Sequence, residues 1–184
     1  DAVSGGARLT AETLNMLHHW REAVPDDRMA HLIRDTERAF RRALQNRLAA
    51  HQVPFGHWSF LRILWATDGL TQRELSERAG VMEPTTFAAI KAMELHGYIT
   101  REQLPTNKKN VYVHLTAAGR ALKKRLVPLA EETNQLSVTG LDPAELAITR
   151  RVLLTMIENL ANDELQHLPL TRRNTVNALK RQGR

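Results

Sequence analysis

The stretch that decides the fold is "MEPTTFAAIKAMELHGYIT", Met82 to Thr100. Its apolar residues recur at helical spacing, and Pro84 stands where the first turn of a helix tolerates proline. Gly97 ends the helical pattern, and a β-branched run follows. In a small basic protein, this order is typical of a helix that lies in a DNA groove. The exposed face, however, has Lys91 as its one basic residue and no arginine.

The segment just before it, "GLTQRELSERAG" (69–80), predicts another short helix. Thr71 and Glu74 have the spacing of a capping box, in which the hydroxyl accepts from a free helix amide and the carboxylate accepts from the amide of the cap residue. Gly80 ends this helix. Two short helices joined by a turn that contains glycine predict a helix-turn-helix unit.

A β-hairpin is predicted directly after the second helix. Two runs rich in β-branched and aromatic residues, "YITREQ" (98–103) and "NVYVHLT" (110–116), flank the polar segment "LPTNKK" (104–109). Thr116 then caps a further helix. The fold class is therefore mostly α, of the α+β kind: a winged helix-turn-helix lobe flanked by N- and C-terminal dimerisation helices.

The predicted organisation has three parts. Residues 1–27 form an N-terminal extension with a short helix, 28–163 form the winged-helix domain, and 164–184 form a basic C-terminal tail. Within the domain, the DNA-binding lobe spans 57–116, and the dimerisation helices span 28–50 and 117–163.

Composition limits the possible functions. The 184 residues include no cysteine, which excludes disulfide scaffolds, thiol nucleophiles and thiolate zinc sites. No apolar run is long enough to span a bilayer and no signal-peptide pattern occurs, so we expect a cytoplasmic protein without membrane contact. The net charge is +6. Basic residues gather in 101–125 and again in 171–184, and such patches attract phosphates. The alternative for the second patch is a solvated, disordered end.

The flanking helices predict a homodimer. Their apolar stripes, led by Leu122, Leu126 and Leu129 in one helix and by Leu153 and Ile157 in another, exceed what a small lobe can cover. Burying them against a second copy avoids the cost of exposure, and a two-fold dimer presents two helices to a pseudo-palindromic operator. The alternative is that the helices fold back on their own subunit.

The motifs "HWSFLRIL" (57–64), "GLTQRELSERAGV" (69–81), "GYITRE" (97–102), "VHLTAAGRAL" (113–122) and "LDPAEL" (141–146) occur in this order. With them the chain resembles the MarR family of bacterial transcriptional regulators. The resemblance implies a winged helix-turn-helix homodimer whose second helix enters the major groove of double-stranded DNA. It also implies a wing that touches the backbone or minor groove, and a small aromatic or phenolic acid that binds between the dimer arms and the lobe and weakens DNA binding.

This chain departs from the family pattern at two places. The wing has Asn107, Lys108 and Lys109 where the family usually has Asp-Arg-Arg, and the recognition helix has Phe87 and Ala88 where it often has serine and arginine. Apolar groups and threonine methyls can contact thymine methyls, which favours an A·T-rich operator. The alternative for Phe87 is packing in the core. The predicted DNA contacts are Thr85, Thr86, Phe87 and Lys91 on the helix, and Arg101, Asn107, Lys108 and Lys109 at the wing.

An effector pocket is expected where the loop before the buried helix joins an arm to the lobe. Imidazole, indole and guanidinium groups suit an aromatic carboxylate. The predicted residues are His51, His57, Trp58, Trp20 and Arg21. The alternative is that Trp58 belongs to the core and the histidines are solvated. If an imidazolium binds the carboxylate, binding should weaken as the pH rises past about 6.5.

The sequence shows no nucleophile elbow, phosphate loop, metal-ligand spacing or paired acids. We therefore expect no enzyme, no catalytic residue, no cofactor and no metal. The predicted function is a homodimeric DNA-binding transcriptional regulator, a repressor released from its operator by a small aromatic acid. The alternative is a ligand-independent architectural or anti-silencing DNA-binding protein.

Overall fold

The computed structural model describes residues 10–22, 29–104 and 107–167. Its helices are α1 (Ala11–Glu22), α2 (Met29–Ala49), α3 (Phe55–Ala66), α4 (Gln72–Ala79), α5 (Glu83–Leu95), α6 (Ala117–Ser137) and α7 (Pro143–His167). Its strands are β1 (Leu70–Thr71), β2 (Ile99–Leu104) and β3 (Asn107–Leu115). The predicted fold class is confirmed: a mostly helical chain with one small antiparallel sheet.

The helix-turn-helix unit consists of α4 and α5, and its boundaries follow the local signals in the sequence. The hydroxyl of Thr71 accepts from the amide of Glu74 at 3.2 Å, and the Glu74 carboxylate accepts from the amide of Thr71 at 2.8 Å. Gly80 follows α4 with a φ of 64°, a left-handed conformation that a residue without a Cβ adopts at little cost. Both predicted end signals of α4 are therefore confirmed.

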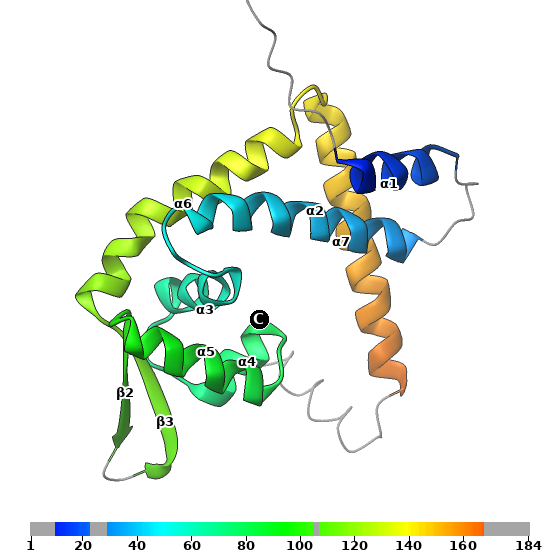
Figure 1. Ribbon diagram of the computed structural model, residues 1–184. Helices are drawn as coiled ribbons and strands as arrows, with labels where there is room; N and C mark the ends of the chain where they lie inside the picture. The colour runs from blue at the N-terminus through cyan, green and yellow to red at the C-terminus, as the bar shows by residue number, and fades with distance from the viewer. Residues whose placement is uncertain (1–9, 23–28, 105–106, 168–184) are drawn as a thin grey trace, which may run out of the picture. The chain divides into compact units, whose positions relative to one another are not determined.

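The wing is the hairpin of β2 and β3, which extends beyond α3, α4 and α5 (Figure 1). The sheet order is β1-β3-β2, with Leu70 opposite Val113 and Ile99 opposite Leu115. The register shifts between Glu102 and Leu104, close to the tip. The base of the wing is thus tied into the lobe by three strands, whereas its outer part is a two-stranded ribbon.

The described residues up to Ser137 belong to one compact unit and share a hydrophobic core. The core extends from the lobe to the end of α2 and the start of α6. These two helices run side by side (Figure 1), and Arg47 of α2 pairs with Glu132 of α6 at 3.3 Å. Among the described residues, the completely buried aliphatic side chains are Leu48, Val53, Leu61, Leu64, Leu75, Ile90, Met93, Ile99, Val113 and Leu126. The described lobe is therefore built directly on the helices that were predicted as arms.

Residues 138–184 form the second unit, whose described element is α7. Asp142 caps this helix by accepting from the amide of Ala144 at 2.7 Å, and Glu145 accepts from the amide of Asp142 at 2.9 Å. The helix continues to His167 rather than ending at residue 163, and the predicted basic tail from 168 onward lies outside the described residues. No described helix combines the length and apolar character required to cross a bilayer.

Candidate nucleic-acid interface

The recognition helix α5 has one buried face and one exposed face. Thr86, Ile90 and Met93 are buried at 0% exposure, which fixes the helix against the core. Thr85, Ala88 and Lys91 are exposed. The helix can therefore present short polar, apolar and cationic groups to a ligand without rearrangement of the lobe.

The prediction that Thr86 contacts DNA is wrong, because its side chain is completely buried. Its hydroxyl lies 2.8 Å from the hydroxyl of Ser76 on α4, and the two groups hydrogen-bond. The hydroxyl of Ser76 also reaches the carbonyl of Gln72 at 3.1 Å. Thr86 thus holds the two helices of the helix-turn-helix unit together and positions its neighbour Thr85 indirectly.

The side chain of Phe87 is 48% exposed, so the alternative that it packs in the core is excluded. Two further apolar side chains of this region are exposed: Met82, just before the helix, at 76%, and Leu95, its last residue, at 81%. An exposed phenyl ring on a recognition helix has no role in the core and is available for the partner.

Arg101, predicted to contact DNA, is already engaged at the base of the wing. Its guanidinium donates to the carboxylate of Glu94 through Nη2 at 2.6 Å and Nε at 2.8 Å. The hydrogen bond from Arg101 lowers the pKa of Glu94, so the acid stays ionised and neutralises the arginine. This pair ties the end of α5 to β2 and leaves less free positive charge there than the sequence indicated.

Asn107, Lys108 and Lys109 are the first residues of β3, immediately after the hairpin tip. All three belong to strand β3, and Asn107 lies opposite Leu104, while their side chains lie outside the described part of the chain. Their role at the DNA backbone therefore stays a prediction that rests on their place in the hairpin.

The motif "LTAAGR" (115–120) locks the wing to the recognition helix, a role that sequence reasoning did not assign. The hydroxyl of Thr116 donates to the carbonyl of Gly97 at 2.6 Å, and its amide donates to the carbonyl of Tyr98 at 3.0 Å. Arg120 donates to the carbonyl of Leu115 at 2.6 Å. The turn after α5 is thereby fixed to the start of α6.

Asp68 completes this lock from the opposite side. Its carboxylate accepts from the amide of Leu115 at 2.9 Å and lies 3.5 Å from Arg120. Nothing in the local sequence marks this role of Asp68, because Leu115 and Arg120 are about 50 residues away along the chain.

The predicted effector residues do not form one site. His57 is buried and packs edge-on against His96 with ring centroids 5.8 Å apart, while Trp58 packs against Trp65 at 5.7 Å. His51 instead lies 3.2 Å from a guanidinium nitrogen of Arg125. Helical neighbours point about 100° apart, so His57 and Trp58 face different surroundings.

The charge expected of His57 is also corrected. Burial lowers the pKa of His57, and the neighbouring His96 lowers it further. Among the described residues, its buried Nδ1 has no hydrogen-bond partner. A neutral imidazole is therefore the form at neutral pH, and it cannot supply the imidazolium that we expected to bind a carboxylate.

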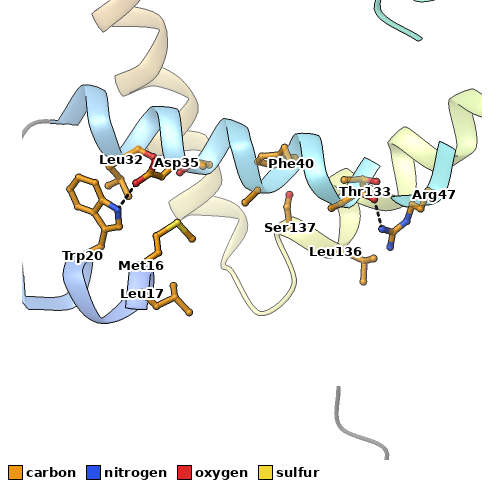
Figure 2. Close-up of a pocket in the computed structure, with 13 residues that line it drawn as sticks. Met16, Leu17, Trp20, Leu32, Asp35, Phe40, Arg47, Thr133, Leu136 and Ser137 are labelled. Atoms are coloured by element: carbon orange, nitrogen blue, oxygen red, sulfur yellow. Dashed lines mark hydrogen bonds between the residues drawn. The ribbon is translucent and has the colours of Figure 1, made fainter. Parts of the chain in front are cut away.

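Trp20 lines a different hollow, of about 470 Å³, between α1, α2 and the end of α6 (Figure 2). Its indole nitrogen donates to Asp35 at 3.2 Å, and apolar side chains such as Leu17, Leu32 and Phe40 line the space. Arg21 is exposed and does not line it. Of the five predicted pocket residues, Trp20 alone lines this hollow.

A further hollow, of about 540 Å³, lies between α2, α3 and the start of α5, and sequence reasoning missed it. Its cationic members are Arg41 and Arg42, and its apolar members include Phe55 and Phe60. The Arg41 guanidinium lies 4.9 Å from the centroid of the Phe55 ring. Thr85 of the recognition helix lines the same hollow. The sequence signal for this hollow was the pair of adjacent arginines in the predicted arm helix. Two adjacent arginines alone do not indicate a pocket.

An exposed helix on a helix-turn-helix unit, with a hairpin wing beside it, defines a DNA-binding protein of the winged-helix class. Residues 56–111 match the model of the MarR family. Over 142 residues the chain is 28% identical to the HTH-type transcriptional regulator TtmR of Methylorubrum extorquens (strain PA1). The match covers 76% of this chain and 68% of TtmR. The matched region, residues 56–111, is therefore a MarR-type winged-helix region, and the chain is similar to transcriptional regulators, as the resemblance implied.

Solved structures show the same fold. The structure of S. aureus MepR in complex with DNA is 20% identical with a TM-score of 0.66, and the match covers 73% of this chain and 99% of MepR. Bordetella bronchiseptica BpsR, whose DNA binding is regulated by 6-hydroxynicotinic acid, is 23% identical with a TM-score of 0.64. That match covers 69% of this chain and 96% of BpsR.

Proposed function

We propose that this regulator is a homodimeric repressor that a small aromatic acid releases from its operator. The observation that carries the proposal is the hollow shared by Arg41, Arg42, Phe55 and Thr85. It joins an arm helix to the recognition helix, so an occupant can change the position of α5 without contacting DNA. The DNA bound to MepR and the acid that regulates BpsR support this class of mechanism.

The dimer is supported by apolar surface that the described chain leaves uncovered. On α7, Leu153, Ile157 and Leu160 are 39%, 63% and 71% exposed and lie on one helical face. On α2, Leu32 and Ile33 are 37% and 40% exposed. Each 100 Å² of such surface costs about 2.5 kcal/mol in water. A second copy removes that cost and places two recognition helices for a pseudo-palindromic operator.

We expect sedimentation at micromolar concentration to give twice the chain mass. Changing Ile157 and Leu160 together to glutamate should shift the protein toward monomer, because buried charges without partners oppose association. Thr155→Glu adds a charge on the opposite side of α7 and should leave the dimer intact. A wild-type monomer at that concentration would contradict the proposal.

The effector should bind through Arg42 and Arg41. A guanidinium can hold a carboxylate with two parallel hydrogen bonds, and the phenyl rings of Phe55 and Phe60 can cover an aromatic ring. Arg41 also pairs with Glu37, but this pair is half-exposed and contributes little, so a ligand can compete for the guanidinium. For a hundredfold loss of DNA affinity, the effector must bind the DNA-free state more tightly than the DNA-bound state by about 2.7 kcal/mol in total, shared between the two effector sites of the dimer.

Calorimetric titration of benzoate and its hydroxylated derivatives tests this site. Arg42→Gln should weaken binding at least tenfold, whereas Arg38→Gln, an exposed change on α2 outside the hollow, should not. Affinity should stay constant between about pH 6 and 8, because a guanidinium keeps its proton and a benzoate is ionised there. A ligand that still binds Arg42→Gln but does not bind His57→Ala would place the effector site at His57, as the sequence predicted, and not in this hollow. No binding across the panel would favour a ligand-independent architectural or anti-silencing protein.

A further inference from the structure

The exposed face of α5 is unusual in its chemistry for a helix that enters the major groove. Phe87 is 48% exposed, and Thr85 and Ala88 beside it are exposed as well. Charged groups on the helix are Glu83, Lys91 and Glu94, so acids outnumber bases there. The surface offered to base edges is therefore mainly apolar.

Guanine recognition normally depends on a bidentate arginine or lysine at the base edge. No arginine occurs in α5, and Arg101 at the base of the wing is held by two hydrogen bonds to Glu94. Lys91 lies one turn after Phe87 on the same flank of the helix, where its long side chain can reach a phosphate. The helix thus lacks a guanidinium for guanine, and its exposed apolar groups include the phenyl ring of Phe87.

We propose that Phe87 is the specificity-determining residue and that it recognises the C5-methyl groups of thymine in the major groove, with Ala88 and the Thr85 methyl completing the apolar surface. The inference rests on the proposed DNA-binding function and names the feature of the operator that this site detects. Thymine is distinguished from cytosine and from uracil by this methyl group, and apolar contact with it supplies base discrimination without a hydrogen bond.

The experiment removes the methyl group alone. An operator is first selected from a random duplex pool, and each thymidine is then replaced singly by deoxyuridine, which keeps the base pair and its hydrogen bonds. At one or two positions in each half-site, the replacement should weaken binding about fourfold per methyl, or about fifteenfold for both half-sites together. Replacing the same base pair by C·G should abolish this contact, and 5-methylcytosine at that position should restore part of it.

Variants assign the effect to the ring. Phe87→Ala should bind the thymine and uracil operators equally, whereas Phe87→Leu should keep part of the difference. Lys91→Ala should weaken both operators by the same factor. Phe87 is half-exposed, so its replacement should leave the circular dichroism spectrum and the melting temperature nearly unchanged.

Two results would overturn the inference. Wild-type protein that binds the selected operator but is indifferent to uracil at every position would exclude methyl recognition while leaving DNA regulation intact. Uracil sensitivity that persists unchanged in Phe87→Ala would assign methyl recognition to another residue. Failure to select any duplex would instead contradict the proposed function itself.

Discussion

Gly119→Ala should lower the free energy of unfolding by about 3 kcal/mol, the upper end of overpacking costs. A Cβ at this position would collide with the carbonyl of Tyr98 and meet Leu115 at 3.1 Å. That carbonyl already accepts from the amide of Thr116 at 3.0 Å, so moving it away would break the bond between the end of α5 and the start of α6. Urea unfolding at a fixed protein concentration measures the effect, because the stability of the proposed dimer would depend on concentration.

Gly56→Ala provides a matched control, since it makes the same change inside another helix. Nothing lies within 4 Å of a Cβ built on Gly56. Alanine there should be neutral or should stabilise the protein by up to about 1 kcal/mol, because glycine has the greater chain entropy to lose. If both variants unfolded at the same urea concentration, the close approach of α6 to Tyr98 would not contribute to stability.

The fold could be predicted because its boundaries depend on local chemistry. The capping box of Thr71 and Glu74 and the cap at Asp142 each involve residues within three positions, so the pattern is complete in the sequence. Gly80 and the hairpin runs are equally local signals. Amphipathic spacing then located the buried faces of the helices, and the order of elements identified the winged helix.

The site was less predictable because its contacts join distant segments. Helical spacing leaves Thr86 at the edge of the exposed face, and the buried hydroxyl of Ser76 that fixes it belongs to the preceding helix. The partner of His57 is His96, on another helix, and burial decides its charge. The hollow between Arg42 and Phe55 likewise arises from tertiary packing, so neither residue alone indicated a pocket.

Changing Lys108 and Lys109 together to alanine should have the largest effect on DNA binding. Both residues begin β3 at the tip of the wing, where a hairpin beside the recognition helix reaches the backbone. If each meets one phosphate, a dimer loses four contacts, and the slope of log affinity against log salt should fall by about 3.6, or about two per subunit. If the affinity at 1 M salt is unchanged, the affinity at 0.1 M salt should be about four-thousandfold lower.

The loss should be the same for the selected operator and for random duplex, because phosphate contacts carry no sequence information. Lys123→Ala with Lys124→Ala removes equal charge from exposed positions of α6 and should change the slope by less than about one unit. This comparison separates direct contact with phosphates from long-range attraction of the DNA. Lys123 and Lys124 serve as the control because Arg101 and Arg120, in the same basic segment, are already paired with Glu94 and Asp68. Fluorescence anisotropy across a salt series measures both slopes. An unchanged slope in the wing variant would mean that the hairpin does not lie on the DNA backbone, and the affinity would then have to come from the helices alone.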